Sequence, residues 1–167
     1  MAQLFVKFFI NKPEIFYQMK KISSLLIAFA ISTTLLAQQP LTTSQQSVQQ
    51  TVIKMFEALS NRDSVSLKAS CAADVTLYEY GQVWNIDTLI LKAITQNQAV
   101  DFKRTNTFDF INTSAGKTMA LINYRLHSAI TKDGKQATVQ WLETVVLLKV
   151  KKQWKVKHLH STLIKRS

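Results

Sequence analysis

Three ionisable side chains near the C-terminal end of the chain, Glu143, His158 and His160, are of types suited to proton transfer. A histidine oriented by a carboxylate is a common general base, because imidazole titrates near neutral pH. His160 and Glu143 are therefore the candidate catalytic pair. The alternative is a cross-strand pair that only stabilises the fold, since such pairs also occur in structural networks.

His158 and His160 are two residues apart and project to the same face of a strand. With Glu143 they would supply the two-histidine, one-carboxylate set of some iron and zinc sites. A His-x-His pair in a closing strand is also compatible with a purely structural role. We therefore expect no metal and no cofactor.

Turn signals divide the C-terminal half of the chain into four strands that must position these residues. Asp133-Gly134 between alternating apolar runs is a strong hairpin signal, and Lys151-Lys152 marks the next turn. The expected strands are 102–112, 117–132, 135–150 and 154–165.

Two-residue turns at these positions predict which side chains are opposite one another. The first places Tyr124 opposite Glu143, and the second places Glu143 opposite His160, although a one-residue slip would exchange the two faces. The face with aromatic and ionisable residues is expected to line a pocket. Aromatic residues at strand spacing are more often part of a plain core, which is the alternative for Tyr78, Tyr80, Trp84 and Tyr124. The candidate ligand contacts are Tyr78, Tyr80, Trp84, Tyr124, Trp141, Trp154 and His158.

The opposite face of the predicted sheet is unusually apolar for a surface in contact with water. An extensive apolar surface of this kind is typical of an interface, so we expect a homodimer formed through it. The residues assigned to this face are Arg125, His127, Leu142, Thr144, Val146, Leu148 and Leu159.

Helices precede these strands. From Ser47, apolar residues recur at spacings of three and four, and the helix is expected to end at Asn61-Arg62-Asp63. A short helix over 64–70, a strand over 75–80 and a helix capped by Asp87 follow. Helices followed by a long antiparallel sheet indicate an α+β fold.

The N-terminal segment has the three parts of a secretory signal. Residues 19–37 contain Met-Lys-Lys, an apolar run of about 15 residues and Ala37 before Gln38. The run is shorter than the roughly 20 residues of a membrane span, and no stable membrane insertion is expected after cleavage. Residues 1–18 are interpreted as an upstream-start artefact, 38–46 as a linker and 47–165 as the domain. The mature protein is therefore expected to be exported, to the periplasm or the medium.

Composition excludes several classes of function. With one Cys, three His and three Gly, the chain lacks a disulfide framework, zinc-finger ligands and glycine-rich phosphate loops. Residues 1–37 carry four basic and one acidic residue, so 17 of 21 basic and 9 of 10 acidic residues remain in the mature part. The positive charges are scattered apart from the lysines around 149–157, which favours a solvated turn over a nucleic-acid site.

Several segments, taken in order, resemble the nuclear transport factor 2-like superfamily, in its SnoaL-like and ketosteroid isomerase-like branch. They are 48–63, Ala73-Asp74-Val75, the strand end at Gly81, Trp84 before a helix, and the terminal 154–161. The resemblance implies a curved sheet wrapped around helices as a cone with a pocket, often dimerising through the sheet. It also implies a tyrosine in the first helix for the isomerase mechanism, whereas this chain has Phe56 and no tyrosine there.

These observations lead to an exported domain that binds a small, partly apolar molecule. One alternative is a cofactor-independent isomerase, dehydratase or hydrolase that uses His160 and Glu143. The other is a non-catalytic dimeric interaction module of the cell envelope. Fold alone does not decide among the three.

The signal predicts cleavage after Ala37. N-terminal sequencing of exported material is expected to begin near Gln38. Detection of residues 1–18, or of the intact apolar run, on the mature protein would contradict the prediction.

Overall fold

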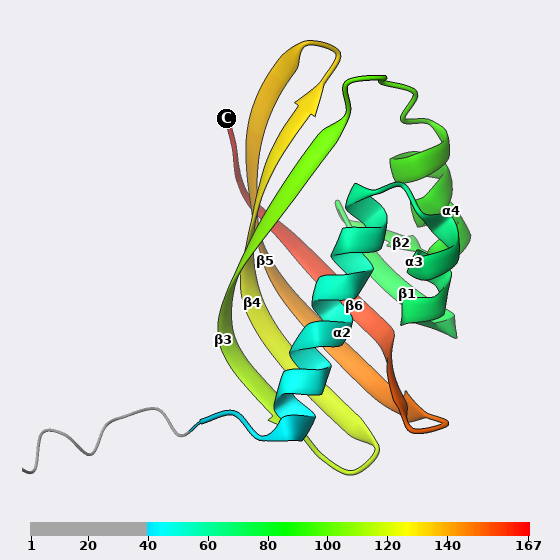
Figure 1. Ribbon diagram of the computed structural model, residues 1–167, viewed down its shortest axis with the longest axis vertical. Helices are drawn as coiled ribbons and strands as arrows, with labels where there is room; N and C mark the ends of the chain where they lie inside the picture. Colours follow the sequence, from blue (N-terminus) through cyan, green and yellow to red (C-terminus); the bar gives the residue numbers. More distant parts are fainter. Residues whose placement is uncertain (1–39) are drawn as a thin grey trace, which may run out of the picture. The chain divides into compact units, whose positions relative to one another are not determined.

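The computed structural model describes residues 40–167, and the expected upstream segment 1–18 and signal peptide 19–37 lie outside them. A six-stranded sheet of order β2-β1-β6-β5-β4-β3 curves around α2 (Figure 1). The strands are β1 (Cys71–Glu79), β2 (Gln82–Trp84), β3 (Lys103–Ala115), β4 (Met119–Lys132), β5 (Lys135–Val150) and β6 (Gln153–Arg166). The helices are α2 (Thr43–Ser60), α3 (Ser64–Ser70) and α4 (Ile86–Ile90), which continues into the π-helical turn η3 (Leu91–Thr95).

Helix α2 begins four residues before Ser47 because Thr42 and Gln45 form a capping box that satisfies its first backbone N–H groups. Its buried face is Val48, Val52, Met55, Phe56, Ala58 and Leu59, and the helix ends at Asn61 as expected. The cap of α4 is Asn85 and not Asp87, since the Asn85 side chain accepts a hydrogen bond from Thr88 N. None of the helices described over 40–167 is long and apolar enough to cross a membrane.

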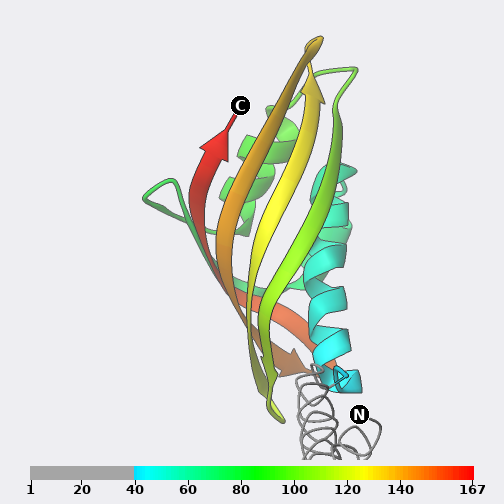
Figure 2. The same cartoon turned by 90° about the vertical axis from the view of Figure 1, so that its left-hand side faces the viewer.

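The expected α+β cone is confirmed. Strands β3 to β6 pair antiparallel in succession, whereas β1 joins the edge of β6 in parallel, so the sheet is mixed. Helix α2 packs on the inner face, and Figure 2 looks onto the outer face, which no described helix covers. The sheet does not close, because β2 and β3 form two separate edges.

The predicted register is correct for one hairpin and wrong for most of the next. Tyr124 pairs with Glu143, as the Asp133-Gly134 turn predicts. Between β5 and β6 the pairing follows the Lys151-Lys152 turn as far as Leu147 and Val156, and then shifts by one residue. Glu143 therefore pairs with Ser161 and not with His160.

This shift is a β-bulge near Lys157, where one extra residue of β6 is accommodated. Beyond it, Leu159 and Ser161 are buried and His160 is exposed. Leu159, which was expected on the outer face, consequently belongs to the core. The expected positions of His158 and His160 on the inner face are wrong for the same reason.

The β4–β5 hairpin and the segment that follows η3 meet at one end of the cone (Figure 1), which we call its mouth. Asp101 accepts hydrogen bonds from the backbone N–H groups of Asp133 (2.8 Å) and Gly134 (2.7 Å), which ties this segment to the hairpin. Arg62 Nη1 donates to the carbonyls of Asn97 (3.0 Å) and Ala99 (3.1 Å). Both ends of the segment are thus held in place around the opening.

Candidate functional site

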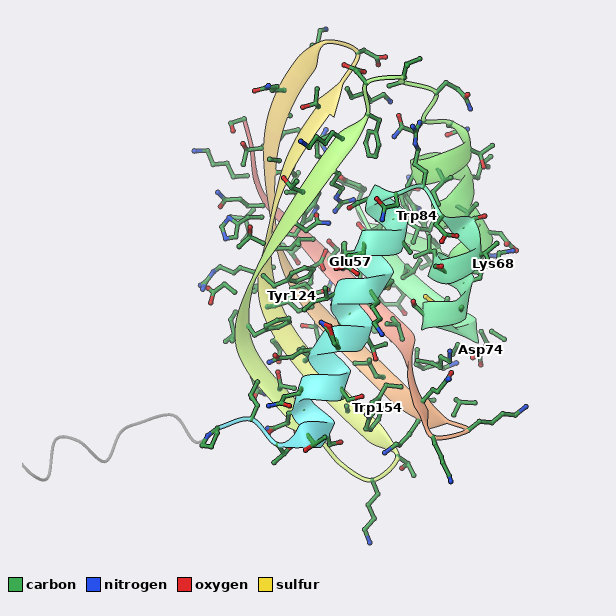
Figure 3. The ribbon with its side chains drawn as sticks, in the orientation of Figure 1. Glu57, Lys68, Asp74, Trp84, Tyr124 and Trp154 are labelled. Atoms are coloured by element: carbon green, nitrogen blue, oxygen red, sulfur yellow. The ribbon has the colours of Figure 1, made fainter. Side chains whose placement is uncertain are left out.

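Glu143 lies at the centre of the cone, with 3% of its surface exposed. Ser161 Oγ donates a hydrogen bond of 3.1 Å to Glu143 Oε1, while Oε2 has no hydrogen-bond partner. The fully buried Tyr124 comes from the neighbouring strand, on the sheet face towards α2 (Figure 3). The Tyr124 hydroxyl, like Glu143 Oε2, is enclosed and has no hydrogen-bond partner.

Arg104, on β3, brings a positive charge into the same interior. Its Nε donates to Asn106 Oδ1 (3.0 Å) and its Nη2 to Ser128 Oγ (3.2 Å). The guanidinium also lies over the rings of Phe56 and Trp141, 5.5 Å from each centroid. Among the ion pairs of residues 40–167, none joins Arg104 to a carboxylate.

Glu79, at the end of β1, is the second carboxyl group of this cluster. Burial raises the pKa of Glu143 to about 7, against smaller opposing effects of Tyr124, Ser161 and Arg104. Burial also raises the pKa of Glu79 to about 7, and the Glu143 charge adds to the effect. Burial lowers the pKa of Arg104, against the opposite influence of both glutamates. Near neutral pH, the two carboxyls are therefore in a range suited to proton exchange.

A cavity of about 490 Å³ opens at the mouth of the cone, and we call it the mouth cavity. Apolar side chains from α2, β4, β5 and the segment after η3 form much of its wall. Basic side chains and one buried amide complete it, and no acidic residue takes part. The lining is Leu59, Lys92, Ala93, Asn97, Phe102, Arg104, Ile130, Lys132, Lys135, Ala137, Val139 and Arg166.

A second cavity, of about 270 Å³, lies where β1 ends beside β6, and we call it the edge cavity. Its wall includes Glu79, Trp141, His160 and Ser161. A larger hollow of about 580 Å³ between α2, α3 and the β5–β6 turn is lined by polar surface groups and by Trp154. It contains none of the interior charged cluster, so the mouth and edge cavities are the better candidates.

The structure does not bring the expected catalytic pair together. His158 and His160 lie on the outer face with Tyr78, whose ring meets theirs edge-on at 4.6 and 5.9 Å between centroids. The two-histidine, one-carboxylate set is not assembled either, because Glu143 is on the inner face. Among residues 40–167, no group of three His, Cys, Asp or Glu side chains could hold a metal ion.

The other candidate ligand contacts are distributed over the molecule. Tyr124 and Trp141 are buried in the inner face, whereas Tyr80 is exposed and tilted against Trp84, with centroids 6.3 Å apart. Trp154 is buried near the β5–β6 turn, and Trp84 lies beside α4 (Figure 3). Tyr80 and Trp141 line the edge cavity, and none of the expected contacts lines the mouth cavity.

Sequence reasoning missed Arg104, Glu79 and Ser161. A signal for Arg104 was present, because Arg104, Asn106, Phe108 and Phe110 alternate with exposed residues along β3. Glu79 follows Val75 and Leu77 at the same two-residue spacing on β1. Ser161 could not be found in this way, since its orientation depends on the bulge.

Comparison with known proteins agrees with this fold. The family described as "SnoaL-like domain" matches residues 48–164. No curated protein matches the sequence significantly.

Three solved structures illustrate the similarity. An NTF2-like protein from Cytophaga hutchinsonii has a TM-score of 0.63 and 14% identity, covering 74% of this chain and 100% of that one. A ketosteroid isomerase-like protein from Erwinia carotovora atroseptica has a TM-score of 0.60 and 15% identity, covering 75% and 99%. The CamKII hub homology domain of Chlamydamonas reinhardtii has a TM-score of 0.65 and 19% identity, covering 75% and 100%. At these identities the similarity shows the fold.

The raised carboxyl pKa values predict a stability that falls as pH rises. Glu143 binds its proton more tightly folded than unfolded, so its stabilising effect is present below about pH 4.5 and is lost as pH rises through about 7. The wild type is expected to lose unfolding free energy between pH 5 and 8. Glu143→Gln is expected to lose about 2 to 3 kcal/mol less over the same interval. Urea unfolding at both pH values measures it, with Glu57→Gln on the α2 surface as control. Parallel pH profiles for wild type and Glu143→Gln would contradict it.

Proposed function

The chain belongs to the SnoaL-like domain family, and from this membership and the geometry of the cone we propose that it is an exported domain that binds a small, partly apolar molecule. The mouth cavity is the proposed binding site. The observation that carries the proposal is its lining, in which six apolar side chains lie beside five basic side chains and Asn97.

The size and composition of the mouth cavity support this function. Pockets for small molecules typically have volumes of about 300 to 1,000 Å³, with apolar walls and few polar groups. Phe102 and Val139 supply apolar wall, and the half-buried Arg104 is a fixed polar contact. The neighbouring segment is tied by Asp101 and Arg62, so contacts within the chain hold the wall of the cavity.

Filling the cavity is expected to abolish binding. Ala137 is half-buried and lines the cavity, so Ala137→Phe would occupy part of its volume. Native mass spectrometry of the purified full chain should detect a co-purified small molecule, with occupancy reduced about tenfold in the variant. Ala129→Phe, at an exposed position of β4, should leave occupancy unchanged. Equal occupancy in both variants would contradict the mouth cavity as the site.

A cofactor-independent isomerase, dehydratase or hydrolase is the second candidate. Glu79 favours it, because this carboxyl has a pKa of about 7 and lines the edge cavity, where a substrate could reach it. Glu143 would then modulate Glu79 from the interior. A catalytic role for His160, which also lines the edge cavity, stays a prediction, now without Glu143 as its partner.

We also propose that the outer face of the sheet binds a second copy of the chain. Met119, Leu121 and Leu142 expose 54%, 39% and 42% of their surfaces there, and Val146 lies among them, paired with Leu121. Apolar patches of this kind are typical of interfaces. A hub domain among the structural neighbours is compatible with association. A non-catalytic module of the cell envelope would use the same face.

Val146→Lys is expected to weaken this association at least about tenfold, because an ammonium group would be desolvated at the interface. Light scattering at several protein concentrations measures the change. Val65→Lys on α3, where Val65 is 77% exposed, is the matched control. A wild-type monomer at micromolar concentration would contradict the proposed dimer.

A further inference from the structure

We propose that the mouth cavity selects small organic anions, and that its ligand is a carboxylate with an apolar body bound by Arg104. This inference rests on the proposed ligand-binding function and adds the chemical class of the ligand. Its support comes from the charges on the cavity wall, the unused donor of Arg104 and a buried amide without a partner.

The wall of the mouth cavity carries charge of one sign. The exposed Lys92, Lys132, Lys135 and Arg166 and the half-buried Arg104 line it, and no acidic side chain is part of the lining. Two acidic residues lie near the lining: Asp133, between Lys132 and Lys135 in the β4–β5 turn, and Asp101, whose two carboxylate oxygens accept hydrogen bonds from the backbone of that turn. A concave surface lined by one sign of charge attracts ligands of the opposite charge and raises their rate of association.

The Arg104 guanidinium is pre-organised to bind an anion. Its Nε and Nη2 donate hydrogen bonds to Asn106 and Ser128, and its Cζ lies over the rings of Phe56 and Trp141. Within residues 40–167, the Nη1 atom of Arg104 donates no hydrogen bond. It is not enclosed either, so it is accessible to a ligand. A carboxylate can therefore accept from Nη1 with little loss of side-chain freedom, since the guanidinium is already fixed.

The carboxyl groups behind Arg104 do not neutralise it through a direct ion pair. Neither Glu79 nor Glu143 lies within 4.0 Å of its guanidinium, since the ion pairs of the described residues are elsewhere. A half-buried guanidinium without a direct counter-ion gains more from an incoming anion than a fully exposed one, because water screens it less.

Asn97 adds an independent indication that the cavity accepts a ligand. Asn97 lines the cavity, 7% of its surface is exposed, and its Oδ1 atom is enclosed with no hydrogen-bond partner. A buried acceptor without a partner is costly, and rotation of the amide towards the cavity would let a hydroxyl or amine of the ligand satisfy it. Leu59, Phe102 and Val139 provide apolar contacts for the rest of the molecule.

Matched pairs of probes test the preference for an anion. Titration calorimetry of the full chain would compare benzoate with benzamide, naphthoate with naphthamide, and decanoate with decanamide. The carboxylates are expected to bind about tenfold or more tightly than the amides. Arg104→Met, which keeps a long apolar side chain beside Phe56 and Trp141, should abolish this difference. Arg125→Met is the control, because it removes the same charge from the outer face, where Arg125 pairs with Asp109.

The outcomes separate this inference from the proposed function. Carboxylates and amides that bind equally well would overturn the anion preference and leave the ligand-binding function standing. An equal loss in Arg104→Met and Arg125→Met would overturn the assignment to Arg104, in favour of net charge. If no probe binds and native mass spectrometry finds no co-purified molecule, both proposals fail. Circular dichroism of each variant establishes that it is folded before binding is measured.

Discussion

One extra residue in β6, accommodated near Lys157, determines which side chains of its second half face the interior of the cone. Because side chains alternate along a strand, this bulge reverses the orientation of the residues that follow it. Ser161 is thereby directed at Glu143, and Leu159 enters the core, while the two histidines reach the outer face. The polar interior and the composition of the outer surface both follow from this single feature of the backbone.

The bulge places Glu143 beside a serine, and this affects the balance of charge in the cone. Ser161 supplies one neutral hydrogen bond, which leaves Glu143 Oε2 without a partner in a setting that raises the pKa of the carboxyl to about 7. Arg104 would be the obvious counter-ion, but Asn106, Ser128 and two aromatic rings hold it in place. Two carboxyls and one guanidinium thus share the interior without a direct ion pair, which is a costly arrangement for stability alone.

The fold was predictable from the sequence because it depends on local signals. Spacing of apolar residues located α2, and the Asp133-Gly134 turn fixed the register that pairs Tyr124 with Glu143. The site was less predictable, because it depends on contacts between distant strands. Nothing in the residues around Lys157 signals a bulge, so the turn at Lys151-Lys152 gave a register that holds only as far as Val156. Glu79 was missed because β1 joins β6 in parallel, a pairing that no turn predicts.

The aromatic residue of the first helix has a different use here from the one that the family resemblance implies. Phe56 has no hydroxyl to donate, and its ring packs edge-on against Tyr124 and Phe108 and beneath the Arg104 guanidinium. The helix thus contributes a surface that orients a cation, while the phenol comes from β4. Cation–π contacts strengthen as water is excluded, so burial of Phe56 favours a fixed guanidinium at this depth. A cone of this kind is better arranged to hold an anion beside Arg104 than to stabilise an oxyanion from α2.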